Sequence, residues 1–396
     1  MFNNAKPLPA DPILGVMAAC ARDTNPKKVD LGVGVYKENS GSTPIFASVK
    51  RAEANLIAEQ QSKAYIGPAG SAEYNRLMTT FVFGDQHTAV NENRIASVQT
   101  PGGCGALRVG AELLKRMRPS CKVWLSNPTW ANHNPLLGDT GIALDTYPYY
   151  DKENNSVLFE DMITCLKTIP ADDVVLIHGC CHNPSGADLS DEQWQVVADI
   201  AKQQGFLVYI DLAYQGFGNG IEEDAYGVRL LAEQLPELMV ANSCSKNFGL
   251  YRERTGTLFV MTEDETQAQA VASYMHKIAR GIYSMPPAHG AGIVETLLSD
   301  QELVTAWHQE LVDVRQRIKS LRKLLADAIQ KNSGNDSFRF IEKQCGMFSY
   351  LGLTTEQVVT LREKFSIYMT NDSRVNIAGL KPDNIEYVAE AIASVI

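Results

Sequence analysis

The chain has 396 residues, 45% hydrophobic and 21% charged, which is enough for two or three domains with an ordinary buried core. Its net charge of −10 disfavours nucleic acid or an anionic membrane as a partner, and no apolar run approaches the ~18 residues of a membrane-spanning helix. Eight cysteines without a CxxC pair, and no recognisable secretory signal, predict reduced thiols, no metal site and a cytoplasmic location.

Short apolar runs alternate with amphipathic helical patterns from residue 48 to about residue 300, after a proline-rich stretch, 1–11, that we expect to be an extended arm. Strands are predicted at 96–99, 123–126, 174–178, 207–211, 238–241 and 257–261. The helix predicted at 191–204 begins with a capping box, Ser190 and Gln193. This alternation predicts an α/β fold, with a mostly parallel, doubly wound sheet in a large domain over 48–300.

The pattern changes after residue 300. A long helix is predicted from 301 to 331, followed by short strands at 338–341, 347–350 and 375–377 between helices. We expect a smaller α+β domain over 301–396, with residues 12–47 as its N-terminal part because the segment 30–36 should pack there.

The residues 243–254 (SCSKNFGLYRER) carry the strongest chemical pattern. They follow a predicted strand, and ligands of open α/β sheets bind beyond the carboxyl ends of strands. Lys246 there could hold an aldehyde cofactor as a Schiff base, while Ser243, Ser245 and Arg254 could bind its phosphate. Pyridoxal phosphate is the cofactor with this chemistry.

A glycine-rich segment, 100–107 (TPGGCGAL), follows the first strand of this domain and opens a helix. Gly103 and Cys104 could offer backbone N–H groups to a phosphate, although a tight turn alone would need the same glycines. A dinucleotide-binding GxGxxG motif is excluded because Arg108 stands where the third glycine would be, which disfavours a nicotinamide-dependent dehydrogenase.

Two further strand ends carry polar residues. Asn183 could donate its amide to a phenolic oxygen, and His178 is expected to be a packed, hydrogen-bonded support. Asp211 could be a helix N-cap, or could meet a pyridinium nitrogen, with Tyr214 near the phenolic oxygen. The presence of Lys246 favours the second interpretation of Asp211.

Two arginines remain, Arg280 at a predicted helix end and Arg374 before a predicted strand. Either could be a surface cation. If both face the cofactor, they would bind the two carboxylates of a dicarboxylic amino acid.

Together the motifs 181–186 (CHNPSG), 213–217 (AYQGF) and 243–246 (SCSK) resemble the aspartate/aromatic aminotransferase family, of fold type I among pyridoxal phosphate enzymes. The resemblance covers nearly the whole chain, including 11–14 (DPIL) and 31–36 (LGVGVY), and is nearest to bacterial aspartate aminotransferases. It implies a cytoplasmic homodimer with shared active sites. It also implies roles for fourteen residues, which are Lys246, Asp211 and Tyr214 in catalysis; Gly103, Cys104, Trp130, Asn183, Ser243, Ser245, Arg254 and Tyr65 at the cofactor; and Gly34, Trp130, Asn183, Arg280 and Arg374 at the substrate.

In detail, the resemblance implies that Trp130 stacks over the ring and that Arg374 binds the α-carboxylate. Tyr65 would reach the phosphate in the partner subunit, and Arg280 would meet the distal carboxylate of the substrate bound there. The implied reaction transfers an amino group from L-aspartate to 2-oxoglutarate by a ping-pong mechanism, with Lys246 as the proton carrier.

Three departures from the family pattern concern selectivity. Cys104 stands where relatives in the family carry a hydroxyl residue, Met285 where they carry a small polar residue, and Ala64 where aspartate-selective relatives carry an asparagine. Other residues, such as Val35, resemble those of the aspartate-selective members. An aromatic-amino-acid or dual-specificity aminotransferase is therefore the alternative. A non-catalytic ligand-binding protein on the same fold is a more distant one, which Lys246 disfavours.

Overall fold

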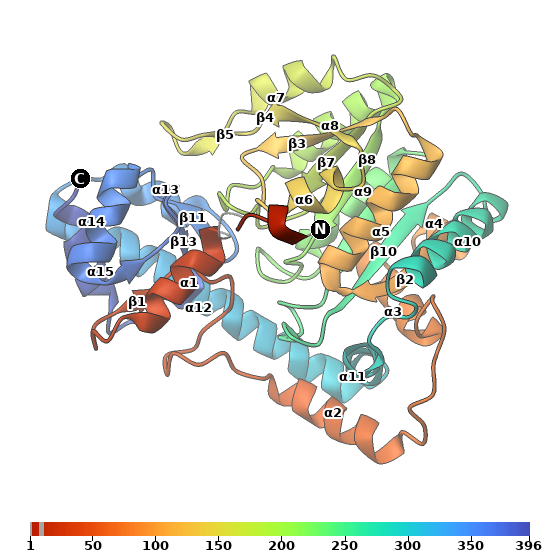
Figure 1. Ribbon diagram of the computed structural model, residues 1–396, viewed down its shortest axis with the longest axis horizontal. Coiled ribbons are helices and arrows are strands. Elements are labelled where there is room, and N and C mark those ends of the chain that lie inside the picture. Colours follow the sequence, from red (N-terminus) through yellow and green to blue (C-terminus); the bar gives the residue numbers. More distant parts are fainter. Residues whose placement is uncertain (1, 8–11) are drawn as a thin grey trace.

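The computed structural model describes residues 2–7 and 12–396, and its centre is a seven-stranded sheet in the order β2-β10-β9-β8-β7-β3-β4 (Figure 1). Only β10 is antiparallel to its neighbours. The mostly parallel, doubly wound sheet predicted from the sequence is thus confirmed. Its strands are β2 (Ile95–Pro101), β3 (Lys122–Asn127), β4 (Ala143–Pro148), β7 (Val174–His178), β8 (Leu207–Leu212), β9 (Leu238–Ser243) and β10 (Thr255–Met261).

Helices cover both faces of this sheet, so every residue of its central strands β7 to β10 is buried. One face packs against α5 (Gly102–Met117) and α10 (Glu265–Ile282), and the other against helices that include α8 (Asp191–Gln204). The predicted capping box is present, since Ser190 and Gln193 each accept the other's backbone N–H. The remaining helices before residue 300 are α1 (Pro12–Arg22), α2 (Ala47–Glu59), α3 (Ala72–Phe83), α4 (Thr88–Asn91), α6 (His133–Gly138), α7 (Phe159–Leu166), η2 (Glu223–Ala225), α9 (Tyr226–Gln234) and α11 (Ala288–Leu298).

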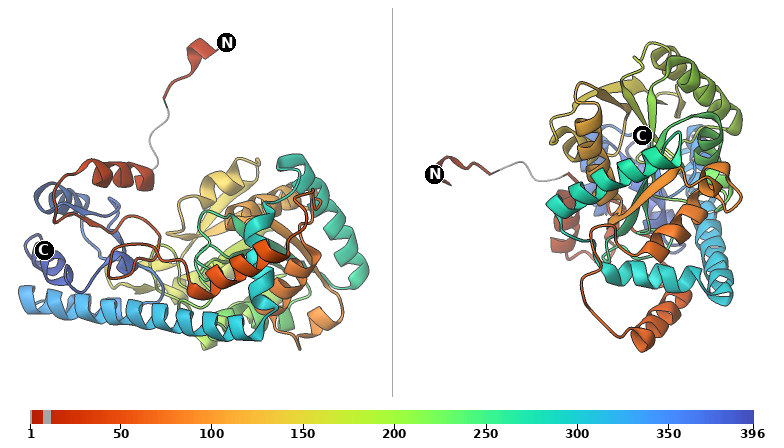
Figure 2. Two further views of the ribbon diagram at one scale, coloured as in Figure 1. Left: turned by 90° about the horizontal axis from the view of Figure 1, so that it is seen from below. Right: turned by 90° about the vertical axis from the view of Figure 1, so that its right-hand side faces the viewer.

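The C-terminal region is organised by α12 (Gln301–Ser333), which extends from beneath the sheet to the far end of the molecule (Figure 2). There β11 (Phe348–Tyr350) pairs with β13 (Arg374–Asn376), and β1 (Val29–Asp30) pairs with β12 (Ile367–Tyr368). The N-terminal segment around residue 30 therefore packs with the C-terminal region, as predicted. The other elements are β5 (Tyr150–Asp151), β6 (Ser156–Val157), η3 (Ser337–Arg339), α13 (Phe340–Lys343), α14 (Thr355–Phe365), η4 (Ile377–Gly379) and α15 (Ile385–Ala393).

One predicted strand is wrong, and one strand of the sheet was not predicted. The segment 338–341 is helical, in η3 and α13, because its buried residues Phe338 and Ile341 stand three apart, which is helical spacing. The edge strand β4 was not predicted, because its residues are mostly exposed or half-buried and give no apolar run.

The N-terminal arm can be compared with the structure only in part, since residues 1 and 8–11 lie outside the described residues. Residues 2–7 include the short turn η1 (Phe2–Asn4) and lie apart from the rest of the chain in Figure 2. Within residues 2–7 and 12–396, no helix combines the length and apolarity needed to cross a membrane.

Candidate active site

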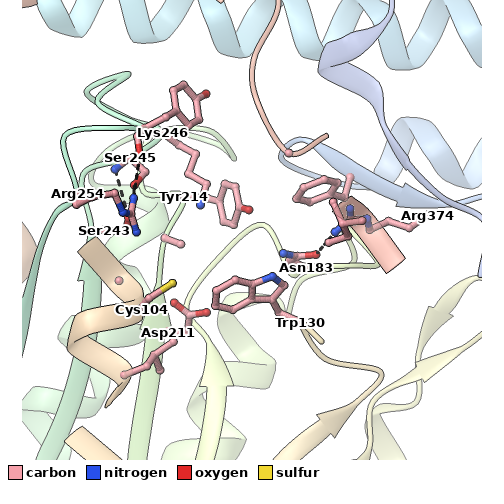
Figure 3. A pocket seen from close by; sticks show the side chains of 17 residues that line it. Cys104, Trp130, Asn183, Asp211, Tyr214, Ser243, Ser245, Lys246, Arg254 and Arg374 are labelled. Carbon is pink, nitrogen blue, oxygen red and sulfur yellow. Dashed lines mark hydrogen bonds between the residues drawn. The ribbon is translucent and has the colours of Figure 1, made fainter. Parts of the chain in front are cut away.

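The polar strand ends meet at the carboxyl edge of the sheet, as strand register requires. His178 lies opposite Asp211 in the β7–β8 pair, and Asp211 lies opposite Ala241 in the β8–β9 pair. These ends border a cavity of about 250 Å³ (Figure 3). The cavity is lined by Ile13, Gly34, Gly103, Cys104, Leu107, Trp130, Asn183, Asp211, Ala213, Tyr214, Ser243, Ser245, Lys246, Tyr251, Arg254, Phe348 and Arg374.

Lys246 projects into this cavity from the turn that follows β9. Its amine nitrogen lies 4.7 Å from the centre of the Tyr214 ring. Burial lowers the pKa of Lys246 below its usual value, although the negative charge of Asp211 opposes this shift. A lower pKa makes a neutral amine more available, as a nucleophile or a base requires.

Asp211 is buried on β8 and shares a hydrogen bond with His133, whose Nε2 lies 3.1 Å from Asp211 Oδ2. Thr129 fixes the other side of the imidazole, with its Oγ1 at 2.8 Å from Nδ1. Burial pushes the pKa of Asp211 upward, but the hydrogen bond and charge of His133 outweigh it and the pKa falls below its ordinary value. The carboxylate is therefore held ionised and can neutralise a cation in the cavity.

His178 is packed as predicted, but it is not the hydrogen-bonded support that the sequence suggested. Neither ring nitrogen has a hydrogen-bond partner among the described residues, and Nε2 lies 4.0 Å from Asp211 Oδ2. The ring packs edge-on against His182, at 4.3 Å between centroids. Burial, followed by the charge of His133, lowers the pKa of His178 to about 3, so the ring remains neutral near pH 7.

Arg254 and the beginning of α5 form an anion-binding cradle. Arg254 has a φ of +53° and donates from Nη1 to Ser245 Oγ (3.3 Å) and to the carbonyl of Tyr251 (2.9 Å). Gly102 must be a glycine, since its φ is +71° and a Cβ would lie 2.5 Å from Arg254 Nη2. The guanidinium thus lies directly against the N-terminus of a 16-residue helix, where two sources of positive potential coincide.

The opposite side of the cavity is formed by Arg374 on β13. Its Nη1 donates to Asn183 Oδ1 (3.3 Å), its Nη2 donates to the Gly32 carbonyl (2.9 Å), and its guanidinium lies 4.5 Å from the centre of the Phe348 ring. Figure 3 shows Arg374 and Asn183 across the cavity from Arg254. The cavity therefore presents cations at both ends, which suits a ligand with two separated anionic groups.

Two of the expected residues, Tyr65 and Arg280, do not line this cavity. Tyr65 is 93% exposed, and both line a second hollow of about 560 Å³ with Tyr283, Ser284 and Met285. Arg280 donates to the Ser284 hydroxyl there. The other twelve expected residues all line the Lys246 cavity.

The structure also places residues in the site that the sequence interpretation missed. His133 on α6 orients Asp211, and its proximity to Trp130 in the sequence could have indicated it. Tyr251 lies within the Lys246 motif and its hydroxyl accepts the backbone N–H of Tyr36 (3.0 Å). Phe348 lies in a predicted strand, but no sequence pattern indicated that its side chain would be on the face of that strand next to Arg374.

Known proteins share this architecture. The profile of the family described as aminotransferase class I and II matches residues 26–392. The aspartate aminotransferase of Salmonella typhi is 46% identical over 396 residues, and the aromatic-amino-acid aminotransferase of Paracoccus denitrificans is 44% identical over 395 residues, each alignment covering 100% of both chains. The solved aromatic-amino-acid aminotransferase from Burkholderia pseudomallei, covalently bound to pyridoxal phosphate, has a TM-score of 0.97 at 39% identity, covering 100% of this chain and 99% of that one. The chain therefore belongs to the class I and II aminotransferase family.

Proposed function

We propose that this protein is a pyridoxal phosphate-dependent aspartate aminotransferase, which converts L-aspartate and 2-oxoglutarate into oxaloacetate and L-glutamate. The observation that carries the proposal is the Lys246 amine, which shares one cavity with Asp211 and with two arginines, Arg254 and Arg374. Family membership supports transamination, and the full-length identity of 46% to an aspartate aminotransferase favours aspartate as the amino donor.

The residues present fit the cofactor. The cradle of Arg254, Ser243 and Ser245, with Gly103 and Cys104 in the first turn of α5, suits a phosphate. A thiol donates more weakly than a hydroxyl, so the contribution of Cys104 to phosphate binding should be smaller than that of the serines. When bound, the cofactor supplies an aldehyde that reacts with amines and a ring that withdraws electrons from the substrate Cα.

The other groups of the cavity have complementary tasks. Lys246 would hold the cofactor covalently and, once released as a neutral amine, take up the proton that leaves the substrate Cα. Asp211, kept ionised beside His133, would stabilise a protonated ring nitrogen. Asn183 and Tyr214 are the polar groups available to a phenolic oxygen, and Trp130 offers an aromatic face for stacking.

Substrate recognition would involve both the cavity and the second hollow. Arg374, with Asn183 and Gly34 beside it, would bind the α-carboxylate. We also propose a cytoplasmic homodimer, in which Tyr65 and Arg280 serve the cavity of the other subunit. Both side chains are exposed, and neither lines this chain's own cavity, which supports this arrangement. The division into a large domain (48–300) and a small domain (12–47 with 301–396) belongs to the same proposal.

A specific observation favours a second candidate, an aromatic-amino-acid or dual-specificity aminotransferase. Met285 and Tyr283 add apolar surface to the hollow that contains Arg280. An apolar lining would accept an aromatic side chain at the position where a distal carboxylate otherwise meets the arginine.

The absorption spectrum of the purified, cofactor-loaded protein tests the proposal. The visible band should change when L-aspartate is added and return when 2-oxoglutarate follows, with oxaloacetate and L-glutamate as products. A band that responds to L-phenylalanine but not to L-aspartate would replace aspartate by the aromatic alternative. A protein that gains no visible band from pyridoxal phosphate would contradict the cofactor assignment.

A further inference from the structure

Arg322 is a buried cation outside the cavity, with 1% of its surface exposed. It lies on α12 and donates five hydrogen bonds, none of them to a carboxylate. Burial lowers its pKa to about 10, so the guanidinium remains charged near pH 7. A buried charge is costly unless its surroundings compensate it, so the groups around this guanidinium must accept its hydrogen bonds.

The five acceptors all belong to one segment, 341–349, which leads into β11. Nη1 bonds to the carbonyl of Ile341 (3.0 Å) and to Ser349 Oγ (2.7 Å). Nη2 bonds to the carbonyls of Cys345 (3.0 Å), Gly346 (2.8 Å) and Phe348 (2.7 Å). Only the planar fork of an arginine can reach acceptors spread in this way, since a lysine offers its donors from a single point.

The loop that carries Asn183 packs against the same backbone carbonyls that accept hydrogen bonds from Arg322. Gly186 has a φ of +72°, and a Cβ there would collide with the Phe348 carbonyl and lie 3.3 Å from Arg322 Nη2. Cys345 donates its N–H to the carbonyl of Gly186 (2.7 Å). Arg322 therefore fixes a surface against which the 182–186 loop of the sheet region is packed.

The segment that Arg322 holds also supports the arginine of the cavity. Phe348, whose carbonyl accepts from Arg322, places its ring 4.5 Å from the Arg374 guanidinium. Tyr350 is paired with Arg374 across the two strands β11 and β13. The positions of Arg374, Phe348 and Asn183 thus all depend on backbone groups that meet at Arg322.

We propose that Arg322 is a positioning residue for carboxylate binding: its fork holds the Phe348 segment, against which the Asn183 loop packs, and so sets the spacing between Arg374 and Asn183. The inference rests on the proposed function, in which those two side chains bind the substrate α-carboxylate. It assigns no contact between Arg322 and the substrate. Asn183, one of the groups proposed to hold the cofactor, lies on a loop that packs against the segment held by Arg322. The phosphate cradle lies on other segments, so cofactor binding should depend on Arg322 much less than carboxylate binding does.

The test is Arg322→Lys in the cofactor-loaded protein, with three readouts. We expect the KM for L-aspartate and the Kd of maleate, a non-reacting dicarboxylate measured by calorimetry, to rise by about 10-fold or more. The Kd of pyridoxal phosphate should stay within about twofold of the wild-type value, and kcat should change less than KM. A general loss of structure would instead move all these quantities together.

Arg339→Lys is the matched control, because Arg339 lies in the same region but bonds to the side chains of Asp327, Gln330 and Glu342 at the surface. This control should leave maleate binding unchanged. Should Arg322→Lys fail to fold, Ser349→Ala removes one acceptor of the fork and should raise the maleate Kd in the same direction, by roughly twofold or more.

The outcomes separate the two proposals. Wild-type maleate affinity in Arg322→Lys, or in Ser349→Ala if that variant is the one measured, would overturn the positioning role. A wild-type protein that neither converts L-aspartate nor binds maleate would instead overturn the proposed function. Weaker maleate binding with unchanged cofactor binding in the variant would support the positioning role.

Discussion

The Lys246 cavity and the Tyr65–Arg280 hollow differ in how completely one chain builds them. In the cavity, Asp211 is bonded to His133, Arg254 to Ser245 and Arg374 to Asn183, so its side chains hold one another in place. In the hollow, Tyr65 is 93% exposed, and the hydrogen bond of Arg280 goes to a residue of its own helix end. The groups for the general chemistry are therefore held in place within one chain, whereas the groups proposed to recognise the substrate side chain lie at its surface.

The largest expected effect is at the centre of the cavity. Lys246→Ala removes the only amine among the described residues that line the cavity, so kcat for transamination should fall by about 10³-fold or more. Steady-state kinetics with L-aspartate and 2-oxoglutarate measure this, with circular dichroism to confirm folding. Near-normal turnover would mean that the cavity is not the reaction centre.

Asp211→Asn keeps the shape of the side chain and removes its charge. We expect kcat to fall by about 10²–10³-fold, because a preorganised charge that stabilises the transition state is lost. Activity must be measured at confirmed cofactor saturation, so that weaker binding is not mistaken for weaker catalysis. Retention of wild-type kcat would remove Asp211 from the ring-nitrogen role.

In the hollow, Arg280→Ala should act selectively. Loss of a charge-assisted pair costs about 1.5–3 kcal/mol, so kcat/KM for L-aspartate should fall roughly 10–150-fold while that for L-phenylalanine changes little. Lys277→Ala, an exposed lysine on the same helix α10, is the matched control and should affect neither substrate. Equal losses for both amino acids would show that Arg280 does not read the distal carboxylate.

Mixing the Lys246→Ala and Arg280→Ala variants tests whether two subunits share one site, with L-aspartate as the substrate. In a hybrid dimer of Lys246→Ala and Arg280→Ala subunits, one cavity would have its own Lys246 and a partner with an intact Arg280. Random reassociation of equal amounts should therefore restore roughly a quarter of the wild-type sites. No recovery after confirmed hybrid formation would contradict the shared-site arrangement.

The smallest expected effect concerns Met285. Met285→Ser removes apolar surface from the hollow, so the ratio of kcat/KM for L-aspartate over L-phenylalanine should rise by about 10-fold or less. This ratio is measured for the wild-type protein and for the variant, with the same 2-oxo acid in both cases. A fall in the ratio would show that Met285 does not favour aromatic side chains.

Local patterns predicted most of the sheet and the polar strand ends of the cavity, because parallel strands that end in polar residues must bring those residues to one edge. Gly34 and Trp130, in contrast, were expected there only from the resemblance to the family. They failed where a pattern was ambiguous or weak. The segment 338–341 was predicted as a strand, but the spacing of its buried residues Phe338 and Ile341 favours a helix. The edge strand β4, whose residues are mostly exposed or half-buried, gave no apolar run.

By itself, the sequence determined the α/β class, the transaminase chemistry and the segments that carry it, since strand periodicity, glycine turns and the Lys246 motif are local properties. Only the tertiary structure decided that His133 orients Asp211, that His178 has no hydrogen-bond partner among the described residues and that Arg322 holds the segment 341–349. The hydrogen bonds among these features link residues 19 or more positions apart, such as Arg322 and Ile341. Their geometry follows from how helices and loops pack on the sheet, and no local pattern in the chain records that packing.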